Sequence, residues 1–154
     1  MLKFLGNIEA KADSKGRLFV PALYRKSLEK SGEASLILQA DPINKCVKLY
    51  PESVWEKMDA EFQANLNLWD RKDLALYRQF TASVEPVELD SNGRILITKK
   101  HMEMIGVETD ALFVGIGNYF EVWNKDTFEA SLCDMDDFAA AMQSKMGNKA
   151  PTLE

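Results

Sequence analysis

The sequence predicts a mixed α+β protein in which two copies of one small unit share a single small β-barrel flanked by helices. The main observation is a repeated pentapeptide, Asp-Ser-Lys-Gly-Arg at residues 13–17 and Asp-Ser-Asn-Gly-Arg at residues 90–94. An apolar triplet follows each copy, at residues 18–20 and 95–97. The same order of short helical and strand patterns then occurs in both halves, which indicates an internal duplication.

The first copy is expected to begin with a loosely alternating strand and to contain two helices. The expected elements are a strand at 3–12, a turn at 13–17, a strand at 18–20, a helix at 22–30, strands at 36–38 and 47–50, and a helix from residue 51. In the first helix, Leu23 and Leu28 are expected to face inward. In the second, apolar residues from Trp55 to Leu66 recur at spacings of three and four and predict one apolar face.

A connecting helix, expected at residues 69–80, leads to the second copy. The expected elements are then a strand at 84–89, a turn at 90–94, a strand at 95–97, a helix at 99–105, strands at 112–114 and 120–123, a closing helix from 125, and a loose tail at 147–154. The closing helix is expected to carry Phe128, Leu132, Met135, Phe138 and Met142 on one face. The two loops are 77 residues apart and the last strands 73, so the second copy is four residues shorter.

The two copies are expected to share one core. A unit of roughly 55 residues buries too little apolar surface to be secure alone, so interleaving both copies in one small barrel is the simplest solution. The predicted organisation is a first repeat at 1–56, a helical connection at 57–81, a second repeat at 82–126, and a C-terminal helix and tail at 127–154.

Composition limits the class of protein. The chain has 154 residues, of which 46% are hydrophobic and 28% charged, and these are globular values. Cys46 and Cys133 lack metal-type spacing, so two buried reduced thiols are expected rather than a disulfide. The single His101 cannot form a histidine cluster. We expect no metal, no cofactor, no secretory signal and no membrane span.

Charge is distributed unevenly along the chain. The net charge is −5, but residues 1–50 carry nine basic and five acidic side chains, a balance of +4, so that the remainder carries −9. This asymmetry predicts a basic face on an otherwise acidic body, although ordinary scatter of charges is an alternative.

The repeated loop contains the residues of a tight turn. Asp13 and Asp90 can accept hydrogen bonds from the backbone ahead of them, and Gly16 and Gly93 supply the positive φ that a tight reversal needs. These four residues are therefore predicted to shape the loops.

The basic residues of the loops are candidates for DNA contacts. Arginine can donate two hydrogen bonds to guanine O6 and N7, while lysine pairs with phosphate. The structural alternative is that each Asp and Arg pair only to hold the turn. Our hypothesis combines both roles, with Arg17, Arg94 and Lys15 contacting DNA. Lys3 and Lys11 are predicted to add phosphate contacts, or else are solvated surface lysines.

Short motifs with a family resemblance run through almost the whole chain, from about residue 1 to residue 145. They are Phe4-Leu5-Gly6, the loop at 13–17 with Leu18, Pro21 and Arg25, Leu49-Tyr50-Pro51, the loop at 90–94, Val114-Gly115 and Phe120-Glu121-Val122-Trp123. In these motifs the chain resembles the MraZ family of bacterial transcriptional regulators, which is associated with the division and cell-wall gene cluster.

The resemblance implies two tandem AbrB-type swapped-hairpin units that form one pseudo-dimeric barrel. It also implies a closed homo-oligomeric ring, located in the cytoplasm at the nucleoid, that binds short direct repeats in double-stranded promoter DNA. Lys15, Arg17 and Arg94 would contact this DNA, and no small-molecule substrate or membrane would be involved. Two positions depart from the family pattern: Ala12 replaces a larger apolar residue, and Asn92 replaces a basic residue. The first loop is therefore predicted to make the stronger contacts with DNA.

Other functions remain open at this point. The main alternative is a ring-forming interaction protein with incidental DNA contact, whose acidic half docks a basic partner. An antidote for a toxin would use the same type of barrel, but the chain lacks a long partner-binding tail. A paired-aspartate enzyme needs one protonated carboxyl group, whereas an arginine four residues after each Asp keeps both ionised. We therefore expect no catalytic residues.

Overall fold

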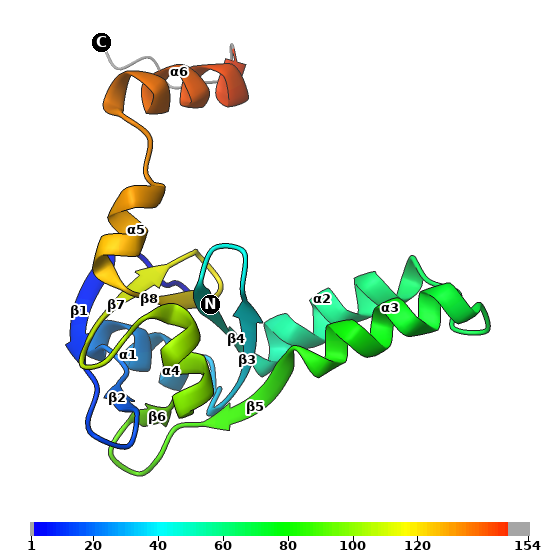
Figure 1. The fold of residues 1–154 in the computed structure, drawn as a ribbon, viewed down its shortest axis with the longest axis horizontal. Coiled ribbons are helices and arrows are strands. Elements are labelled where there is room, and N and C mark those ends of the chain that lie inside the picture. The colour runs from blue at the N-terminus through cyan, green and yellow to red at the C-terminus, as the bar shows by residue number, and fades with distance from the viewer. Residues whose placement is uncertain (1, 148–154) are drawn as a thin grey trace.

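The order of elements in the structure repeats, as the sequence predicts. The computed structural model describes residues 2–147. In chain order, the elements are β1 (Asn7–Lys11), β2 (Arg17–Phe19), α1 (Ala22–Lys30), β3 (Ser35–Asp41), β4 (Cys46–Pro51), α2 (Glu52–Ala64), α3 (Arg71–Ala82), β5 (Val84–Glu88), β6 (Arg94–Leu96), α4 (Lys99–Ile105), β7 (Asp110–Gly115), β8 (Phe120–Trp123), α5 (Lys125–Ser131) and α6 (Met135–Met146) (Figure 1). Two strands, a helix and a hairpin followed by a helix therefore occur twice.

The strands of the two repeats are interleaved. The main sheet has six strands in the order β1-β7-β8-β4-β3-β5, and every ladder in it is antiparallel. The opening strand of each repeat pairs with the hairpin of the other repeat, β1 with β7 and β5 with β3. The remaining hairpin strands, β4 and β8, pair with each other in the middle. Neither repeat can therefore form its share of the sheet alone.

The sheet ladders do not close into a barrel. β1 and β5 lie at the two edges of the six-stranded sheet, and no ladder joins them within residues 2–147. The remaining two strands, β2 and β6, form a separate antiparallel ribbon. The mixed α+β class is thus confirmed, while the closed pseudo-dimeric barrel stays a prediction.

One hydrophobic core serves both repeats, as predicted. Its centre is an aromatic cluster in which the Phe4 ring lies 5.3 Å from Tyr24 and 5.0 Å from Phe120. Phe113 of the second repeat lies 6.3 Å from Tyr24 of the first. The Tyr24 hydroxyl donates to the Gly6 carbonyl at 2.7 Å, which satisfies its polar group within the core. The core thus holds α1 of the first repeat against the hairpin of the second.

The prediction for the inward face of α1 is half wrong. Leu28 is buried, but Leu23 is 69% exposed, and Tyr24 and Ser27 are buried instead. Residues five positions apart cannot share one helical face, because successive side chains are rotated by about 100°. Tyr24 and Leu28 are four positions apart and therefore face the core together.

The opening strand is also shorter than predicted. β1 begins at Asn7, and Phe4 makes only an isolated bridge to Gly117. Gly6 interrupts the strand because its φ is +78°, a left-handed conformation. The irregularity predicted at Gly6 is therefore present, and β1 begins only after it.

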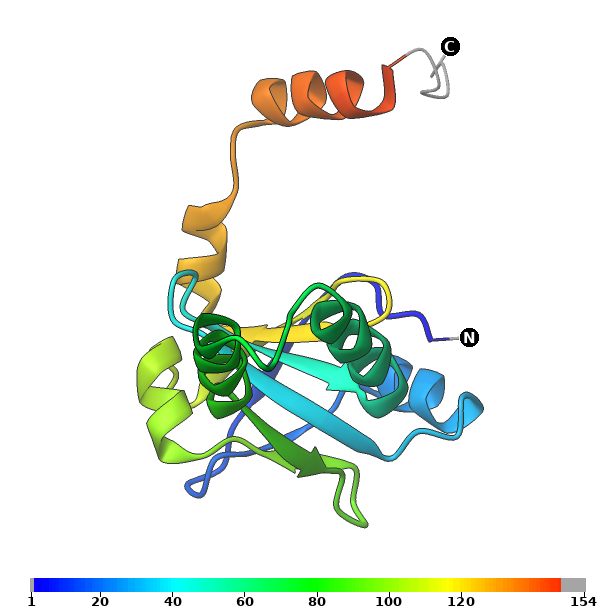
Figure 2. The same cartoon turned by 90° about the vertical axis from the view of Figure 1, so that its right-hand side faces the viewer.

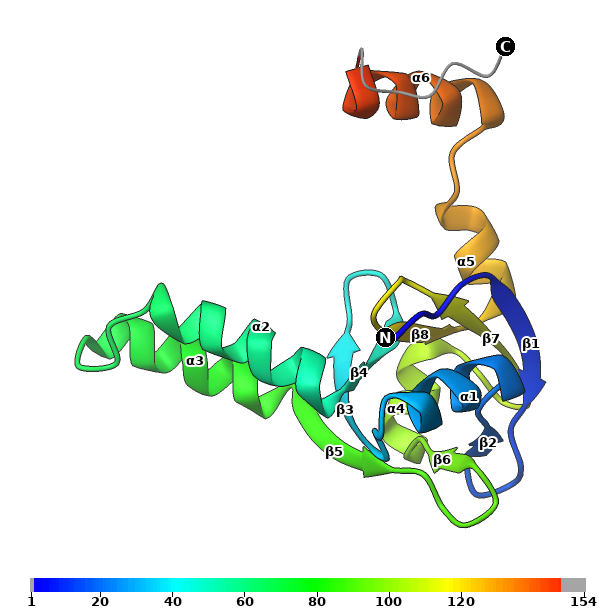
Figure 3. The ribbon, with the colours of Figure 1, turned by 180° about the vertical axis from the view of Figure 1, so that it is seen from behind.

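Helices α2 and α3 form a hairpin that extends from one side of the body (Figures 1 and 3). Trp55 stacks on Phe80 with ring centroids 5.2 Å apart, and Phe62 meets Phe80 at 4.7 Å. The predicted apolar face of α2 therefore packs within the chain. Leu66 lies beyond the end of α2, and Trp69 lies before α3 with 98% of its surface exposed, so both fall outside their predicted helices.

The single closing helix predicted from residue 125 is wrong. The structure has two helices, α5 and α6, and α6 stands away from the body (Figure 2). Leu132 is extended, with ψ at 141°, and the Asp134 carboxylate accepts a hydrogen bond from the amide of Asp137 at 2.8 Å. This N-cap starts a new helix. Phe128 packs on Trp123 with centroids 5.4 Å apart, whereas Phe138 in α6 is 51% exposed.

The cysteines differ in environment. Cys46 is buried as predicted, and burial, with help from the charges of Glu121 and Asp41, raises the pKa of its thiol to about 12. Cys133 is exposed in the segment between α5 and α6, so the prediction of a buried thiol is wrong there. The break in the closing helix is the reason, because it removes Cys133 from any packed face.

The predicted loose tail at 147–154 lies, after Gly147, outside the described residues. Within residues 2–147, no helix combines the length and apolar character that a bilayer span needs.

Candidate nucleic-acid interface

The β2–β6 ribbon brings the two repeated turns to one end of the molecule. We call residues 13–17 the first loop and residues 90–94 the second loop. Leu18 pairs with Ile95 in the ribbon, and both side chains are buried, which anchors the ribbon to the core. Both loops lie at the end of the body opposite α5 and α6 (Figures 1 and 3). The duplication in the sequence thus becomes a pair of neighbouring loops.

Two reciprocal hydrogen bonds connect the ribbon to the loops. The amide of Ile97 donates to the Gly16 carbonyl at 2.9 Å, and the amide of Val20 donates to the Gly93 carbonyl at 3.0 Å. Each loop is therefore held by the strand that leaves the other loop. Because both bonds cross between repeats, the relative position of the loops depends on the interleaved fold.

The Asp13 carboxylate organises the first loop. Its Oδ1 accepts hydrogen bonds from the amides of Lys15 and Arg17, both at 2.9 Å, and its Oδ2 accepts from Nε of Arg17 at 2.6 Å. One carboxylate thus shapes the turn and orients the guanidinium. Asp13 and Arg17 therefore pair as the structural alternative describes, and the contact of Arg17 with DNA stays a prediction.

The second loop repeats the same arrangement. Asp90 Oδ1 accepts from the amides of Asn92 at 2.8 Å and Arg94 at 2.9 Å, and Oδ2 accepts from Nε of Arg94 at 2.8 Å. The bonds to residue 92 use its backbone, so the change from lysine to asparagine leaves the loop shape unaltered. The two loops differ in charge but not in conformation.

The glycines allow both turns. Gly16 has φ at +88° and Gly93 has φ at +80°, conformations that strongly favour glycine. A Cβ at Gly16 would overlap the Ile97 carbonyl oxygen, and one at Gly93 would lie 2.6 Å from Cδ of Arg25. Gly16 therefore needs glycine for the backbone conformation and for space, whereas Gly93 needs it chiefly for the backbone conformation, because the neighbouring atoms belong to the Arg25 side chain.

The hydrogen bonds also lower the pKa values of the loop aspartates. Mainly because the Arg17 amide donates to it, with smaller contributions from the Arg17 guanidinium and the Lys15 amide, the pKa of Asp13 falls from 3.8 to about 2. The Arg94 amide lowers the pKa of Asp90 in the same direction.

We predict that the first loop stays ordered well below the usual pKa of aspartate. The folded-state pKa is depressed, so the stabilisation is complete above 3.8 and is lost as the pH falls from 3.8 toward 2. An NMR titration of the Asp13 side-chain carboxyl carbon should give a midpoint near pH 2. A midpoint close to 3.8 would show that the hydrogen bonds are not formed in solution.

The arginines keep donors available after pairing with aspartate. Each guanidinium uses Nε for the carboxylate, and the terminal nitrogens of Arg17 and Arg94 make no hydrogen bond to any residue from 2 to 147. Arg94 also lies over the ring of Phe19, its ladder partner, at 5.7 Å from the ring centroid. The exposed Lys15 has no ion-pair partner in the same range. The loops therefore present three cationic groups.

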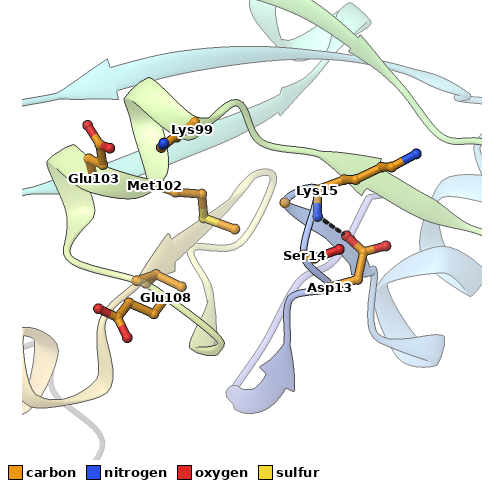
Figure 4. Close-up of a pocket in the computed structure, with 9 residues that line it drawn as sticks. Asp13, Ser14, Lys15, Lys99, Met102, Glu103 and Glu108 are labelled. Atoms are coloured by element: carbon orange, nitrogen blue, oxygen red, sulfur yellow. Dashed lines mark hydrogen bonds between the residues drawn. The ribbon is translucent and has the colours of Figure 1, made fainter.

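A hollow of about 460 Å³ lies between the first loop and α4 (Figure 4). Lys99 lines it together with the carboxylates of Glu103 and Glu108. In Figure 4 the Lys15 side chain extends away from both glutamates, so its ammonium group lies apart from their carboxylates. The hollow is open and of mixed charge, and no group of three or more His, Cys, Asp or Glu suited to a metal occurs in residues 2–147.

The two other predicted lysines lie apart from the loop tips. Lys11 ends β1 next to the first loop, and its Nζ lies 3.9 Å from Asp110 on an exposed surface. Lys3 precedes β1, at the end of that strand away from the loop, and its amide donates to Ser27. The structure thus brings Lys11 near Lys15 and Arg17, but not Lys3.

Two basic residues near the loops were missed as site residues by the sequence analysis, Lys99 beside the first loop and Arg25 beside the second. Arg25 on α1 packs against Gly93 of the second loop. No local pattern could have indicated its position, because Arg25 lies 68 residues before Gly93 in the sequence.

The fold and the loops define a class of protein, a duplicated α+β protein whose interleaved repeats present two matching basic turns at one end. The comparison with protein families identifies the class more closely. The model of the family described as MraZ protein matches residues 3–78 and 80–146, one match for each repeat. The chain belongs to the MraZ family.

Several curated relatives are similar over nearly their whole length. The chain is 42% identical to the transcriptional regulator MraZ of Bacteroides thetaiotaomicron over 149 residues, covering 97% of this chain and 96% of that protein. It is 40% identical to the protein of the same name from Bacteroides fragilis over 152 residues, covering 99% and 96%. For that of Phocaeicola vulgatus, the identity is 38% over 146 residues, with 95% of each covered.

Proposed function

We propose that this protein is a sequence-specific DNA-binding transcriptional regulator that binds short direct repeats in promoter DNA through its two loops. The observation that carries the proposal is the pair of identical Asp–Arg turns held side by side by the β2–β6 ribbon. The relatives named transcriptional regulator MraZ support the same function.

The geometry of Arg17 and Arg94 suits base recognition. Aspartate holds Nε, so the plane of each guanidinium is fixed while its terminal nitrogens remain available. A guanidinium oriented in advance loses little side-chain entropy when it donates two hydrogen bonds to guanine. Lys15 then contacts phosphate, as does Lys11, and Lys3 is retained as a more distant phosphate contact. Asp13, Gly16, Asp90 and Gly93 shape the loops.

Self-association into a ring is the second part of the proposal. All described residues of α6 are exposed, including Met135, Phe138 and Met142, and this apolar face has no partner within the described part of the chain. A second copy of the chain is the occupant we propose. Linked copies gain avidity on repeated half-sites, by about 10²- to 10⁴-fold where the spacing fits. The protein would act in the cytoplasm, associated with the nucleoid.

We further propose the AbrB-type swapped-hairpin arrangement with a pseudo-dimeric barrel. The pairing of each opening strand with the hairpin of the other repeat supports it. The division of the chain at residues 1–56, 57–81, 82–126 and 127–154 belongs to the same proposal.

Salt dependence tests the proposed function. With a duplex taken from the region upstream of its own gene, we expect log affinity to fall linearly with log salt, by about 0.9 for each phosphate contact. Footprinting on the same region should show protection at regularly spaced direct repeats. A random duplex of equal length is the control. A slope near zero, or equal affinity for both duplexes, would favour a ring-forming interaction protein instead.

A further inference from the structure

We infer that Arg25 of the first repeat completes the DNA-contacting surface of the second loop. It supplies the basic side chain that this loop lacks at Asn92. The inference rests on the proposed function and adds a residue to it. It changes the expected contributions of the two loops to DNA affinity, since the second loop then has a cation beside Arg94.

The contacts of Arg25 place it against the second loop. Nε of Arg25 donates to the Val20 carbonyl at 2.9 Å, while the amide of Val20 donates to the Gly93 carbonyl at 3.0 Å. A Cβ at Gly93 would lie 2.6 Å from Cδ and 2.9 Å from a terminal nitrogen of Arg25. The Arg25 side chain therefore runs along the backbone of the second loop.

The pseudo-symmetry of the fold shows what is unusual about Arg25. The position related to it by 77 residues is Met102, a buried residue that lines the hollow beside the first loop. The first loop thus has Lys15 on the loop and an apolar residue on the adjacent helix. The second loop has the neutral Asn92 on the loop and Arg25 on the adjacent helix. Arg25 thus gives the second loop a cation besides Arg94, whereas the first loop has Lys15 on the loop itself and Lys99 of α4 across the hollow.

The charge of Arg25 has no neutralising partner in the part of the chain that the structure describes. Arg25 is half-buried, and no carboxylate of residues 2–147 pairs with it. Its Nε is held by a backbone carbonyl, so that, as in Arg17 and Arg94, the terminal nitrogens remain without a hydrogen-bond partner in the described part of the chain. A guanidinium in this position is suited to a phosphate that follows the strand contacted by Arg94.

The test replaces Arg25 by the residue of the other repeat. We expect Arg25→Met to weaken binding to the upstream duplex about tenfold and to reduce the salt slope by about 1, as for the loss of one phosphate contact. Lys26→Met removes the same charge from an exposed position one residue further along α1 and should leave the slope unchanged. Arg25→Lys keeps the charge and should retain most of the affinity.

A rescue variant distinguishes DNA contact from a structural role. Asn92→Lys places a basic side chain on the second loop itself, as Lys15 does in the first loop. Added to Arg25→Met, it should restore the affinity and the slope, which a loss of stability would not allow. Thermal unfolding of every variant is measured in parallel.

The outcomes separate the two proposals. If the wild-type protein binds and Arg17→Ala does not, but Arg25→Met behaves like Lys26→Met, the inference about Arg25 is overturned and the proposed function stands. The same holds if Asn92→Lys fails to rescue a folded Arg25→Met variant. If the wild-type protein shows no salt-dependent binding, the proposed function fails, and the inference with it.

Discussion

Replacing Arg17 by alanine is expected to abolish operator binding in a mobility-shift assay and to leave the oligomer intact. A bidentate contact to guanine contributes about 1–3 kcal/mol of discrimination, and the loss would recur in every subunit that contacts a repeat. The variant would also leave the Asp13 carboxylate, now without its guanidinium partner, facing a polyanion. The expected loss therefore exceeds that of one hydrogen bond.

The matched control is Arg71→Ala, which removes an exposed arginine at the start of α3, on the helical hairpin rather than at the loops. It should bind as the wild type does. With Arg25 beside the second loop, we expect Arg94→Ala to cause a loss comparable to that of Arg17→Ala. This expectation differs from the sequence-based one, in which the first loop dominates. Undiminished binding by Arg17→Ala, with the control unchanged, would remove Arg17 from the interface.

Gly16→Ala is expected to have the largest effect on stability. The substitution forces an L-residue to adopt φ of +88°, which costs about 1–2 kcal/mol. Its Cβ would also overlap the Ile97 carbonyl oxygen, so the backbone must shift and weaken the bond from the Ile97 amide to the Gly16 carbonyl. A lost bond of this kind adds about 1–3 kcal/mol. Denaturant unfolding should therefore show a loss of about 3 kcal/mol.

Gly32→Ala separates the two causes. Gly32 also has a positive φ, +68°, but a Cβ there meets no atom within 4 Å. Its loss should be limited to backbone strain, about 1–2 kcal/mol. Equal losses for the two variants would mean that the contact between the first loop and the outgoing strand of the second repeat contributes nothing. Reduced DNA binding is expected for Gly16→Ala alone.

Local chemistry explains why much of the fold could be predicted. Asp, Gly and Arg at fixed spacing define a turn whose hydrogen bonds lie within five residues, so both loops were predicted with their aspartates as acceptors. The strands and most helices follow from apolar periodicity. The prediction was wrong where two interpretations of one pattern compete, as at Leu23 and in the segment around Leu132. Leu23 lies five positions from Leu28 and so on another side of α1, whereas Leu132 satisfies the helical spacing but faces solvent.

The break after α5 shows the limit of periodicity. Phe128 to Met142 has the spacing of one apolar face, yet Asp134 caps a second helix and only Phe128 reaches a packed surface. Helix stability comes chiefly from the surface against which a face packs, and an apolar stripe does not specify that surface. Asp134 was the signal in the sequence that a new helix begins there, because aspartate is a common N-cap residue.

By itself the sequence determined the duplication, the shape of each loop and the identity of the residues within it, because these depend on contacts between near neighbours. Only the tertiary structure decided which strands pair and what lies beside each loop. The β1–β7 ladder joins residues 99 to 107 positions apart and the β5–β3 ladder joins residues 45 to 53 positions apart, and no local pattern encodes such pairing. For the same reason Arg25, 68 residues before Gly93, is found beside the second loop only once the chain is folded.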